Sequence, residues 1–399
     1  MPAAIAPLAV TDYTLISALG TGRAAHQEAV QAQRGGLRAN DFSKSPLDCW
    51  IGRVDGLEDQ PLPEPWLSWD SRNNRLAWRG LQADGFEHSV REAAGRHGAG
   101  RVAVLLGTST GSIGASEDGY RDLRDGRLPP SARRAHIHSL HSLAGFVAAA
   151  FDLHGPCLTV STACSSSAKV FAMAERMLRL GLADAALVGG VDTLCQSVLF
   201  GFNALELVSP QPCRPFDRAR RGISIGEAAA FALLERTGRA PQAPRLVGYG
   251  ESSDAWHMST PHPEGLGAQR ALDDALARAG VSPEAVDYVN LHGTATIKND
   301  EVEAALVARR FSPRTRVSST KGYTGHTLGA AGAVEAALVL LALEQGRVPG
   351  NLGCDEPEPV LAEHLARQGE ARPLRLALSN SFGFGGNNAC LAFATGSVA

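Results

Sequence analysis

Three short apolar runs in the first half of the chain have the length of β-strands. They cover residues 101–107, 157–161 and 185–191, and the last two are apolar enough to be buried strands. Between these two, residues 165–180 have helical periodicity, and Gly181 marks the expected end of that helix. A strand, a helix and a second strand in this order predict a parallel βαβ unit. We therefore expect an α/β structure.

The second half repeats this alternation of strands and helices. A polar stretch containing Gly238, Pro241 and Pro244 interrupts the order between the two halves. We place a boundary there, which gives an N-terminal half at 1–240 and a C-terminal half at 241–399. The further expected elements are a helical pattern at 66–96, strands at 245–250, 286–291 and 317–319, helices at 268–280, 300–310 and 329–345, and a hairpin of 374–380 with 390–394.

Composition narrows the class of protein without defining an activity. Hydrophobic residues make up 44% and charged residues 20% of the 399 residues, as in an ordinary globular enzyme. The formal net charge of −3 gives no reason to expect a nucleic-acid or membrane-surface partner. We find no signal peptide in the first 18 residues, and no apolar run that we expect to span a bilayer.

The cysteines point to a reducing compartment. There are seven, scattered along the chain and without a CxxC pair. This pattern argues against a disulfide framework and against a zinc site, and it favours the cytoplasm.

One cysteine, Cys164, occupies a position suited to catalysis. It falls at the predicted turn between the strand at 157–161 and the helix at 165–180. A thiol at a helix N-terminus is close to unpaired N–H groups and to the positive end of the helix dipole, which favour a thiolate and can stabilise an oxyanion. A nucleophile and a buried structural cysteine are both compatible with this segment alone.

Two histidines follow predicted strands in the second half. His292 begins a polar loop with Gly293 and two threonines, and His326 lies with Lys321 in a glycine-rich turn before a helix of small residues. Taken separately, His292 fits a turn histidine, His326 a helix-capping residue and Lys321 a solvated surface lysine. Glu335, on the following helix, is a candidate ion-pair partner for Lys321.

A glycine-rich turn at 383–386 lies between the last two predicted strands and can present backbone N–H groups to a ligand. Alone it is weak evidence. Together, a cysteine, two histidines, a lysine and a loop of backbone donors meet the needs of acyl transfer through a thioester. The spacing offers no metal-ligand cluster, and no GxGxxG motif follows a strand, so we expect neither a metal nor a nicotinamide cofactor.

From about residue 101 to residue 393, the chain resembles the β-ketoacyl-acyl carrier protein synthases, condensing enzymes of the thiolase superfamily. Five motifs agree with that family in the same order. They are TACSSS at 162–167, CRPFD at 213–217 with GE at 226–227, HGTAT at 292–296, KGYTGH at 321–326 and GFGG at 383–386. The stretch at 72–75 and the residues around Cys164 also resemble condensing enzymes of aryl polyene-type pathways.

The resemblance implies a thiolase-like fold of two similar α/β/α/β/α halves in five layers. It also implies that Cys164 accepts an acyl group, and that malonyl carrier protein then loses carbon dioxide and attacks the Cys164 thioester. His292 and His326 would stabilise the enolate, and Lys321 and Glu335 would set the electrostatics around His326. The remaining implied roles are an oxyanion hole at the backbone N–H groups of Cys164 and Phe384, and substrate binding by Thr294, Thr296, Thr110, Phe202 and Gly385.

The same resemblance implies the partners. The pantetheine arm would be carried by an acyl carrier protein, so no dissociable cofactor is expected, and the chain would form a homodimer or pair with a homologous subunit. For an acidic carrier protein we expect a local basic patch, with Arg72, Arg75, Arg133 and Arg134 as candidates. The position of Thr110 matches a gate in the family's acyl pocket, although its hydroxyl would serve equally well within its own turn.

Three other functions are compatible with parts of this pattern. A non-catalytic chain-length factor resembles its partner throughout but replaces the nucleophilic cysteine, whereas Cys164, His292 and His326 are all present here. A thiolase acting on coenzyme A thioesters pairs its cysteine with one histidine and a second cysteine, which disfavours that assignment. A domain of a modular polyketide synthase is disfavoured because no further domain is visible in these 399 residues.

Overall fold

The computed structural model describes residues 2–129 and 132–396. Its main feature is an 11-stranded sheet in which β1 (Leu8–Ser17) and β10 (Arg245–Ser253) pair at the centre and join two halves. The hydrogen-bonded order is β12-β11-β15-β16-β10-β1-β9-β7-β5-β6. The other strands of this order are β5 (Val102–Gly107), β6 (Cys157–Val160), β7 (Ala185–Asp192), β9 (Ala228–Arg236), β11 (Tyr288–Asn290), β12 (Arg316–Ser318), β15 (Leu376–Gly383) and β16 (Asn387–Ala394).

The two halves have the same strand topology. In the first half, β5 runs parallel to both β6 and β7, whereas β9 runs antiparallel to both β7 and β1. In the second half, β11 is parallel to β12 and β15, and β16 is antiparallel to β15 and β10. Numbered along the chain, the strands of each half therefore lie in the spatial order 3-2-4-5-1. The two halves share this strand order although the sequence shows no tandem repeat.

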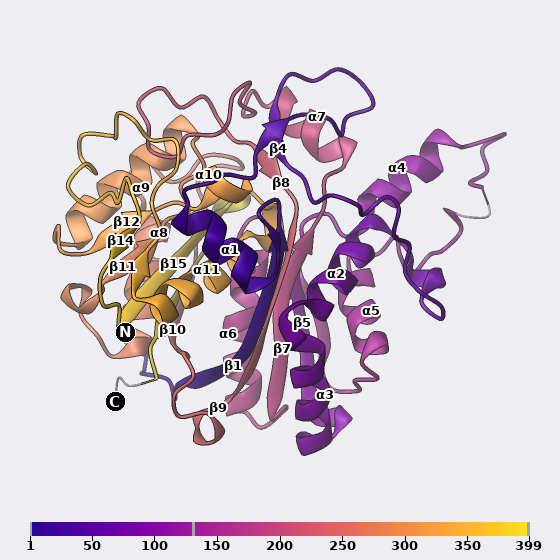
Figure 1. The fold of residues 1–399 in the computed structure, drawn as a ribbon, viewed down its shortest axis with the longest axis horizontal. Coiled ribbons are helices and arrows are strands. Elements are labelled where there is room, and N and C mark those ends of the chain that lie inside the picture. Colours follow the sequence, from indigo (N-terminus) through magenta and orange to yellow (C-terminus); the bar gives the residue numbers. More distant parts are fainter. Residues whose placement is uncertain (1, 130–131, 397–399) are drawn as a thin grey trace.

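Helices complete five layers. At the centre, α6 (Ser166–Arg179) and α11 (Ala331–Gln345) pack against each other and against strands of both halves (Figure 1). One outer layer contains α2 (Arg72–Gln82), α3 (Phe86–His97) and α5 (Ser142–Ala150), and the other contains α8 (Leu266–Ala279) and α9 (Ile297–Arg310). The expected α/β/α/β/α arrangement is confirmed. The smaller elements are α1 (Gly22–Gln31), α4 (Ile113–Arg121), α7 (Gln196–Ala204), α10 (Lys321–Thr324), β2 (Gly20–Thr21), β3 (Arg38–Ala39), β4 (Trp50–Gly52), β8 (Ile225–Gly226), β13 (Arg347–Val348) and β14 (Glu370–Ala371).

The central position of α11 explains its composition. The stretch Leu328–Gln345 is long and apolar enough, by length and composition alone, to cross a membrane, but 89% of it is buried inside the protein. A helix that is covered on all sides needs no polar face. Its contacts with α6, β9 and β15 supply that cover.

Two expectations from the sequence need correction. The helical pattern at 66–96 is divided into α2 and α3 by a turn at Ala83–Gly85. Asp84 adopts a positive φ of 56° in this turn, and its carboxylate accepts hydrogen bonds from Thr14 and from the backbone of Arg23. Strand β6 is only half-buried because it lies at the edge of the sheet. The other predicted strands and helices are present, with ends shifted by a few residues.

Candidate active site

The nucleophile candidate lies in a constrained turn. Cys164 follows β6 and comes just before α6, as the sequence predicted, and Ala163 takes a positive φ of 52°. The hydroxyl of Ser166 accepts a hydrogen bond from the backbone N–H of Thr162 at 2.9 Å and donates one to the carbonyl of Ala163 at 2.5 Å. The serine that begins the helix therefore holds the turn that aims the thiol.

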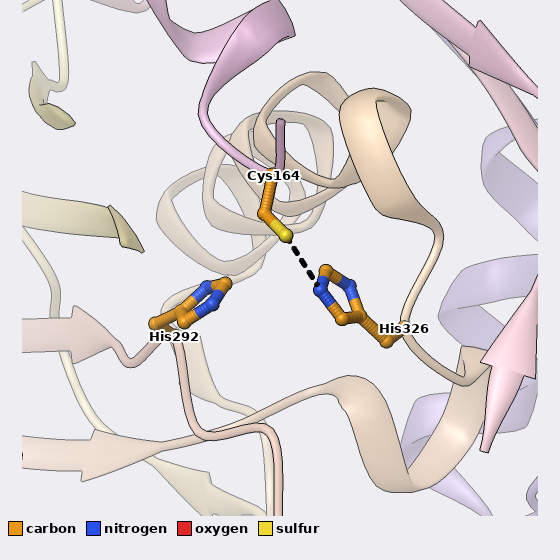
Figure 2. Close-up of side chains that lie close together, drawn as sticks. All are labelled: Cys164, His292 and His326. Carbon is orange, nitrogen blue, oxygen red and sulfur yellow. Dashed lines mark hydrogen bonds between the residues drawn. The ribbon is translucent and has the colours of Figure 1, made fainter. Parts of the chain in front are cut away.

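The fold brings both histidines to this thiol. His292 follows β11 and His326 follows α10, and Figure 2 shows their rings converging on Cys164. The Sγ atom of Cys164 lies 3.0 Å from Nε2 of His326, and the two imidazole rings are 5.4 Å apart at an angle of 86°. Cys164 comes from the first half and both histidines from the second, so the packing of the two halves against each other brings these distant residues together.

Burial is the main influence on the charge of the thiol. Burial raises the pKa of Cys164 to about 11, while the Lys321 charge and a hydrogen bond from the backbone N–H of Phe384 act in the opposite direction. The sequence predicted surroundings that favour a thiolate, whereas burial shifts the pKa of this thiol in the opposite direction. The thiol is protonated at neutral pH, and it needs a base to react as a nucleophile.

The histidines are neutral for related reasons. Burial and the charge of Lys321 hold the pKa of His326 well below its usual value. Burial, Lys321 and His326, in that order, lower the pKa of His292 in the same direction. A neutral imidazole can accept a proton from a thiol or donate one hydrogen bond to a developing oxyanion.

Lys321 contacts His292 directly, and in addition to burial its charge lowers the pKa of His326, as the family resemblance implied. Its buried ammonium donates to the carbonyl oxygen of His292 at 2.5 Å, lies 3.4 Å from Nδ1 of the same residue, and forms an ion pair with Glu335. Burial raises the pKa of Glu335 to about 7. Within the described residues Nδ1 of His326 has no hydrogen-bond partner. Lys321 therefore fixes the tautomer of His292, whereas that of His326 can change.

The glycine-rich turn lies directly against the nucleophile. The backbone N–H of Phe384 points at Sγ of Cys164. A Cβ atom on Gly383 would lie 3.2 Å from the backbone nitrogen of Cys164, and Gly385 has a positive φ of 74°. These two positions favour glycine, because any side chain would push the Phe384 N–H away from the thiol or strain the turn.

A cavity of about 320 Å³ leads to these groups from the surface. Four of the five residues expected to bind substrate line it, namely Thr294, Thr296, Phe202 and Gly385. The two threonine hydroxyls lie 2.9 Å apart, and the rings of Phe202 and Phe384 lie 5.6 Å apart.

Thr110, the fifth residue, does not line this cavity. Its hydroxyl donates to the buried carboxylate of Asp192 at 2.6 Å, and its backbone N–H donates to the same carboxylate at 2.8 Å. Thr108 also donates to Asp192, at 2.7 Å. Asp192 ends β7 and Thr108 follows β5, so this network ties together the ends of two neighbouring strands.

Two buried carboxylates that the sequence analysis missed position the loop of His292. Glu303 accepts the backbone N–H groups of His292 at 2.9 Å and Gly293 at 2.8 Å, and Asp300 accepts that of Thr294 at 3.0 Å. Burial raises the pKa of Glu303 to about 7 and that of Asp300 to about 6. Both lie on α9, three residues apart and therefore on one face, a spacing that offered a signal.

None of the four arginines expected to form a basic patch, Arg72, Arg75, Arg133 and Arg134, lines this cavity. Arg72 is paired with the buried Glu227 and with Glu58, and Arg75 is paired with Asp70. These arginines therefore stabilise the fold. Arg133, although exposed, donates to the carbonyl of Leu128, in the segment between β5 and α5.

The three reacting side chains are also compatible with a metal by type and distance. The ligand atoms of Cys164, His292 and His326 all lie within 4.8 Å of one another, a cluster that the spacing along the chain did not predict. Cysteine and histidine are ligands that suit Zn²⁺. However, the ammonium of Lys321 lies 3.4 Å from Nδ1 of His292, and its charge opposes that of a dication.

Comparisons with known proteins agree with this geometry. The N-terminal domain model of the β-ketoacyl synthase family matches residues 74–240, and the C-terminal domain model matches residues 244–355. A 3-oxoacyl-[acyl-carrier-protein] synthase 2 of Rhizobium meliloti is 39% identical over 313 residues, which are 73% of each chain.

Solved structures extend the similarity to nearly the whole chain. A ketosynthase in complex with its chain length factor from Xenorhabdus doucetiae is 37% identical, with a TM-score of 0.85 and 98% coverage of both chains. The ishigamide ketosynthase/chain length factor is 26% identical, with a TM-score of 0.87 and coverage of 98% of this chain and 100% of the other.

Proposed function

The chain belongs to the β-ketoacyl synthase family, and from this premise we propose that it condenses an acyl group on Cys164 with a malonyl group delivered by an acyl carrier protein. It is an acyltransferase of the 3-oxoacyl-acyl carrier protein synthase type. One observation carries the proposal for the site: the thiol of Cys164 lies 3.0 Å from a neutral imidazole of His326, with His292 beside them. A thiol, a base and a fixed hydrogen-bond donor are what the two half-reactions require.

In the first half-reaction, His326 accepts the thiol proton through Nε2. The sulfur then forms a bond to the carbonyl carbon of the incoming thioester, and the backbone N–H groups of Cys164 and Phe384 stabilise the oxyanion. The bond to the carrier thiol breaks, and the proton passes to that leaving group. The result is an acyl-Cys164 thioester and a free carrier thiol.

In the second half-reaction, the malonyl carboxylate leaves as carbon dioxide, and its bonding electrons form an enolate on the carrier thioester. His292 donates to the enolate oxygen from Nε2, because Lys321 occupies Nδ1, and His326 assists. The enolate carbon attacks the acyl-Cys164 carbonyl, and the carbon–sulfur bond breaks. Cys164 takes up one proton, and the product is a 3-oxoacyl carrier protein.

Several further assignments accompany this proposal. Thr294 and Thr296 bind the pantetheine arm in the cavity, with Phe202 and Gly385 along its wall, and Lys321 and Glu335 balance the charge beneath His292. Because the arm belongs to the carrier protein, the reaction needs no dissociable cofactor. Residues 1–240 form the half that carries the nucleophile and residues 241–399 the half that carries both histidines. The matching strand order of the two halves supports this division.

The relatives support proposals for the oligomeric state, the cellular compartment and the pathway. We propose a homodimer, or a heterodimer with a homologous subunit as in the complex from Xenorhabdus doucetiae, which acts in the cytoplasm. All seven cysteines are free, which supports a reducing compartment. The pathway is fatty acid or polyketide synthesis, with an aryl polyene as a specific candidate.

Analysis of the Cys164 acyl adduct tests the proposal. Incubation with a series of acyl carrier proteins, followed by peptide mass spectrometry, is expected to place the acyl group on Cys164 alone. Cys157 is the internal control, because it is more exposed than Cys164. Acylation of another cysteine with Cys164 unmodified would contradict the assignment. A chain-length factor would carry no acyl group, and a thiolase would accept coenzyme A thioesters in preference.

A further inference from the structure

The rim of the cavity carries exposed apolar side chains. Leu205 directly precedes two lining residues, Trp256 and Met258 lie between the lining residues Asp254 and Ser259, and Ile297 lines the cavity itself. The exposed fractions are 51% for Leu205, 58% for Trp256, 73% for Met258 and 55% for Ile297. We call these four residues the rim patch. Apolar side chains that gather around one opening on a soluble protein mark an interaction surface.

The backbone beneath the rim patch is fixed. The carbonyl of Met258 accepts the N–H of Gly385 at 2.8 Å, and the carbonyl of Ile297 accepts the guanidinium of the buried Arg220 at 3.2 Å. Leu207 donates its backbone N–H to Phe202 at 3.2 Å, which closes the turn around Leu205. A fixed rim presents its apolar side chains at little entropic cost to a partner.

The charges on this rim nearly cancel. Arg221 and Lys298 are exposed lining cations, and Glu206 is an exposed lining anion. Lys298 is paired with Glu301 at 3.4 Å. Two exposed cations are therefore matched by two anions, Glu206 and Glu301, and two of the arginines expected to form a basic patch, Arg72 and Arg75, are paired elsewhere. The rim offers little electrostatic attraction to an acidic partner.

We propose that the rim patch is the docking surface for the carrier protein, and that this carrier presents a face with apolar side chains and little net charge around its pantetheine arm. The inference rests on the proposed function, because it requires an arm that enters this cavity. A protein that threads its arm through the opening must cover the rim. The exposed side chains there, and not a basic patch, then select the carrier.

A double variant, Trp256→Ser with Met258→Ser, tests the docking surface, since neither residue lines the cavity. With hexanoyl carrier protein as the acyl donor, the KM is expected to rise by at least about tenfold with little change in kcat. With hexanoyl pantetheine, the same thioester without the protein, kinetics are expected to match those of the parent. The parent KM for the carrier is expected to change little with salt.

Leu182→Ser is the matched control. Leu182 is 54% exposed, but it precedes β7 and so lies at the opposite end of that strand from Asp192 and the site. Its removal is expected to leave both substrates unaffected. A parent-like KM for the carrier in the double variant would overturn the proposal, as would an equal loss with both donors, or a steep salt dependence together with a large effect of Arg221→Glu. If the parent enzyme uses neither donor, the proposed function itself fails.

Discussion

Nζ of Lys321 lies 3.4 Å from Nδ1 of His292 and 2.5 Å from the carbonyl oxygen of the same residue. An ammonium can only donate, so Nδ1 of His292 must be an acceptor and Nε2 must carry the hydrogen. One buried charge therefore determines the tautomer of this histidine, and it adds to burial in keeping the ring neutral. The pairing with Glu335 makes burial of that charge possible.

Lys321→Met is expected to lower the rate of malonyl decarboxylation by about 10²–10³-fold, the usual cost of losing one well-placed oxyanion donor. Without the ammonium, one of the causes that lower the pKa of His292 is lost, so this pKa rises, while burial still holds it below its ordinary value. The residual activity should therefore begin to change with pH at a higher pH than that of the parent. Carbon dioxide release measured against pH tests this.

The double variant Lys321→Met with Glu335→Gln is the control for this effect, because it removes both charges and leaves no unpaired buried acid. If it recovers the parent pH profile and rate, the effect of Lys321 is only to compensate Glu335, and the tautomer argument is wrong.

Cys164→Gln is expected to abolish condensation and to retain malonyl decarboxylation. The amide cannot accept an acyl group, but His292 and His326 are still present to stabilise the enolate. Release of carbon dioxide without 3-oxoacyl product is the expected result. His292→Ala should then remove the decarboxylation from this background, and retention of the rate would show that His292 does not stabilise the enolate.

The alkylation rate of Cys164 should increase steeply with pH. Its pKa is raised to about 11 by burial, so the thiol form predominates at neutral pH and the thiolate fraction grows tenfold for each pH unit below that value. Iodoacetamide labelling followed by peptide mass spectrometry measures this rate. A plateau from pH 5 to pH 8 would instead reveal a resting thiolate–imidazolium pair.

Glu303→Gln is expected to destabilise the loop of His292 by about 1–3 kcal/mol, because one of two backbone N–H donors would face an amide NH₂ group. The raised pKa of Glu303 means that the folded state binds a proton more tightly than the unfolded state. This stabilising contribution is fully present below the unfolded value of about 4.5, and it is lost as the pH rises through about 7.

The stability advantage of the parent over Glu303→Gln should therefore be larger in acid than at pH 8. Denaturant unfolding of the two proteins across this range measures it. An advantage that grows with pH would contradict the direction assigned to the Glu303 pKa.

If Thr110 gates the acyl pocket, Thr110→Ile is expected to slow reaction with long acyl chains more than with short ones. A methylene-sized difference in such a pocket changes the activation free energy by about 1–3 kcal/mol. Thr110→Val is the matched control. It keeps the volume but removes the hydrogen bond to Asp192, so its loss should be equal for all chain lengths. If both variants lose the same activity at every chain length, Thr110 supports its turn and does not gate the acyl pocket.

Much of the local structure and most of the chemistry could be predicted from the sequence. The βαβ unit around Cys164, helix α6 and the last hairpin follow from periodicity and from glycine positions, and α11 follows from its alanine-rich composition, all of which act over a few residues. The motifs around Cys164, His292, Lys321 and Phe384 indicated thioester chemistry for the same reason, since each is a contiguous stretch that keeps its own turn geometry.

What only the tertiary structure decided concerns groups that are distant in sequence and close in space. The contact of Cys164 with His326 joins residues 162 positions apart, and the neutral thiol results from burial, which no local pattern contains. Three further contacts belong to this class: Lys321 with His292, the carboxylates of α9 with the loop of His292, and the hydrogen bonds of Thr110 to Asp192. Short-range preferences shape each turn, but desolvation and charge pairing depend on what the rest of the chain packs around it.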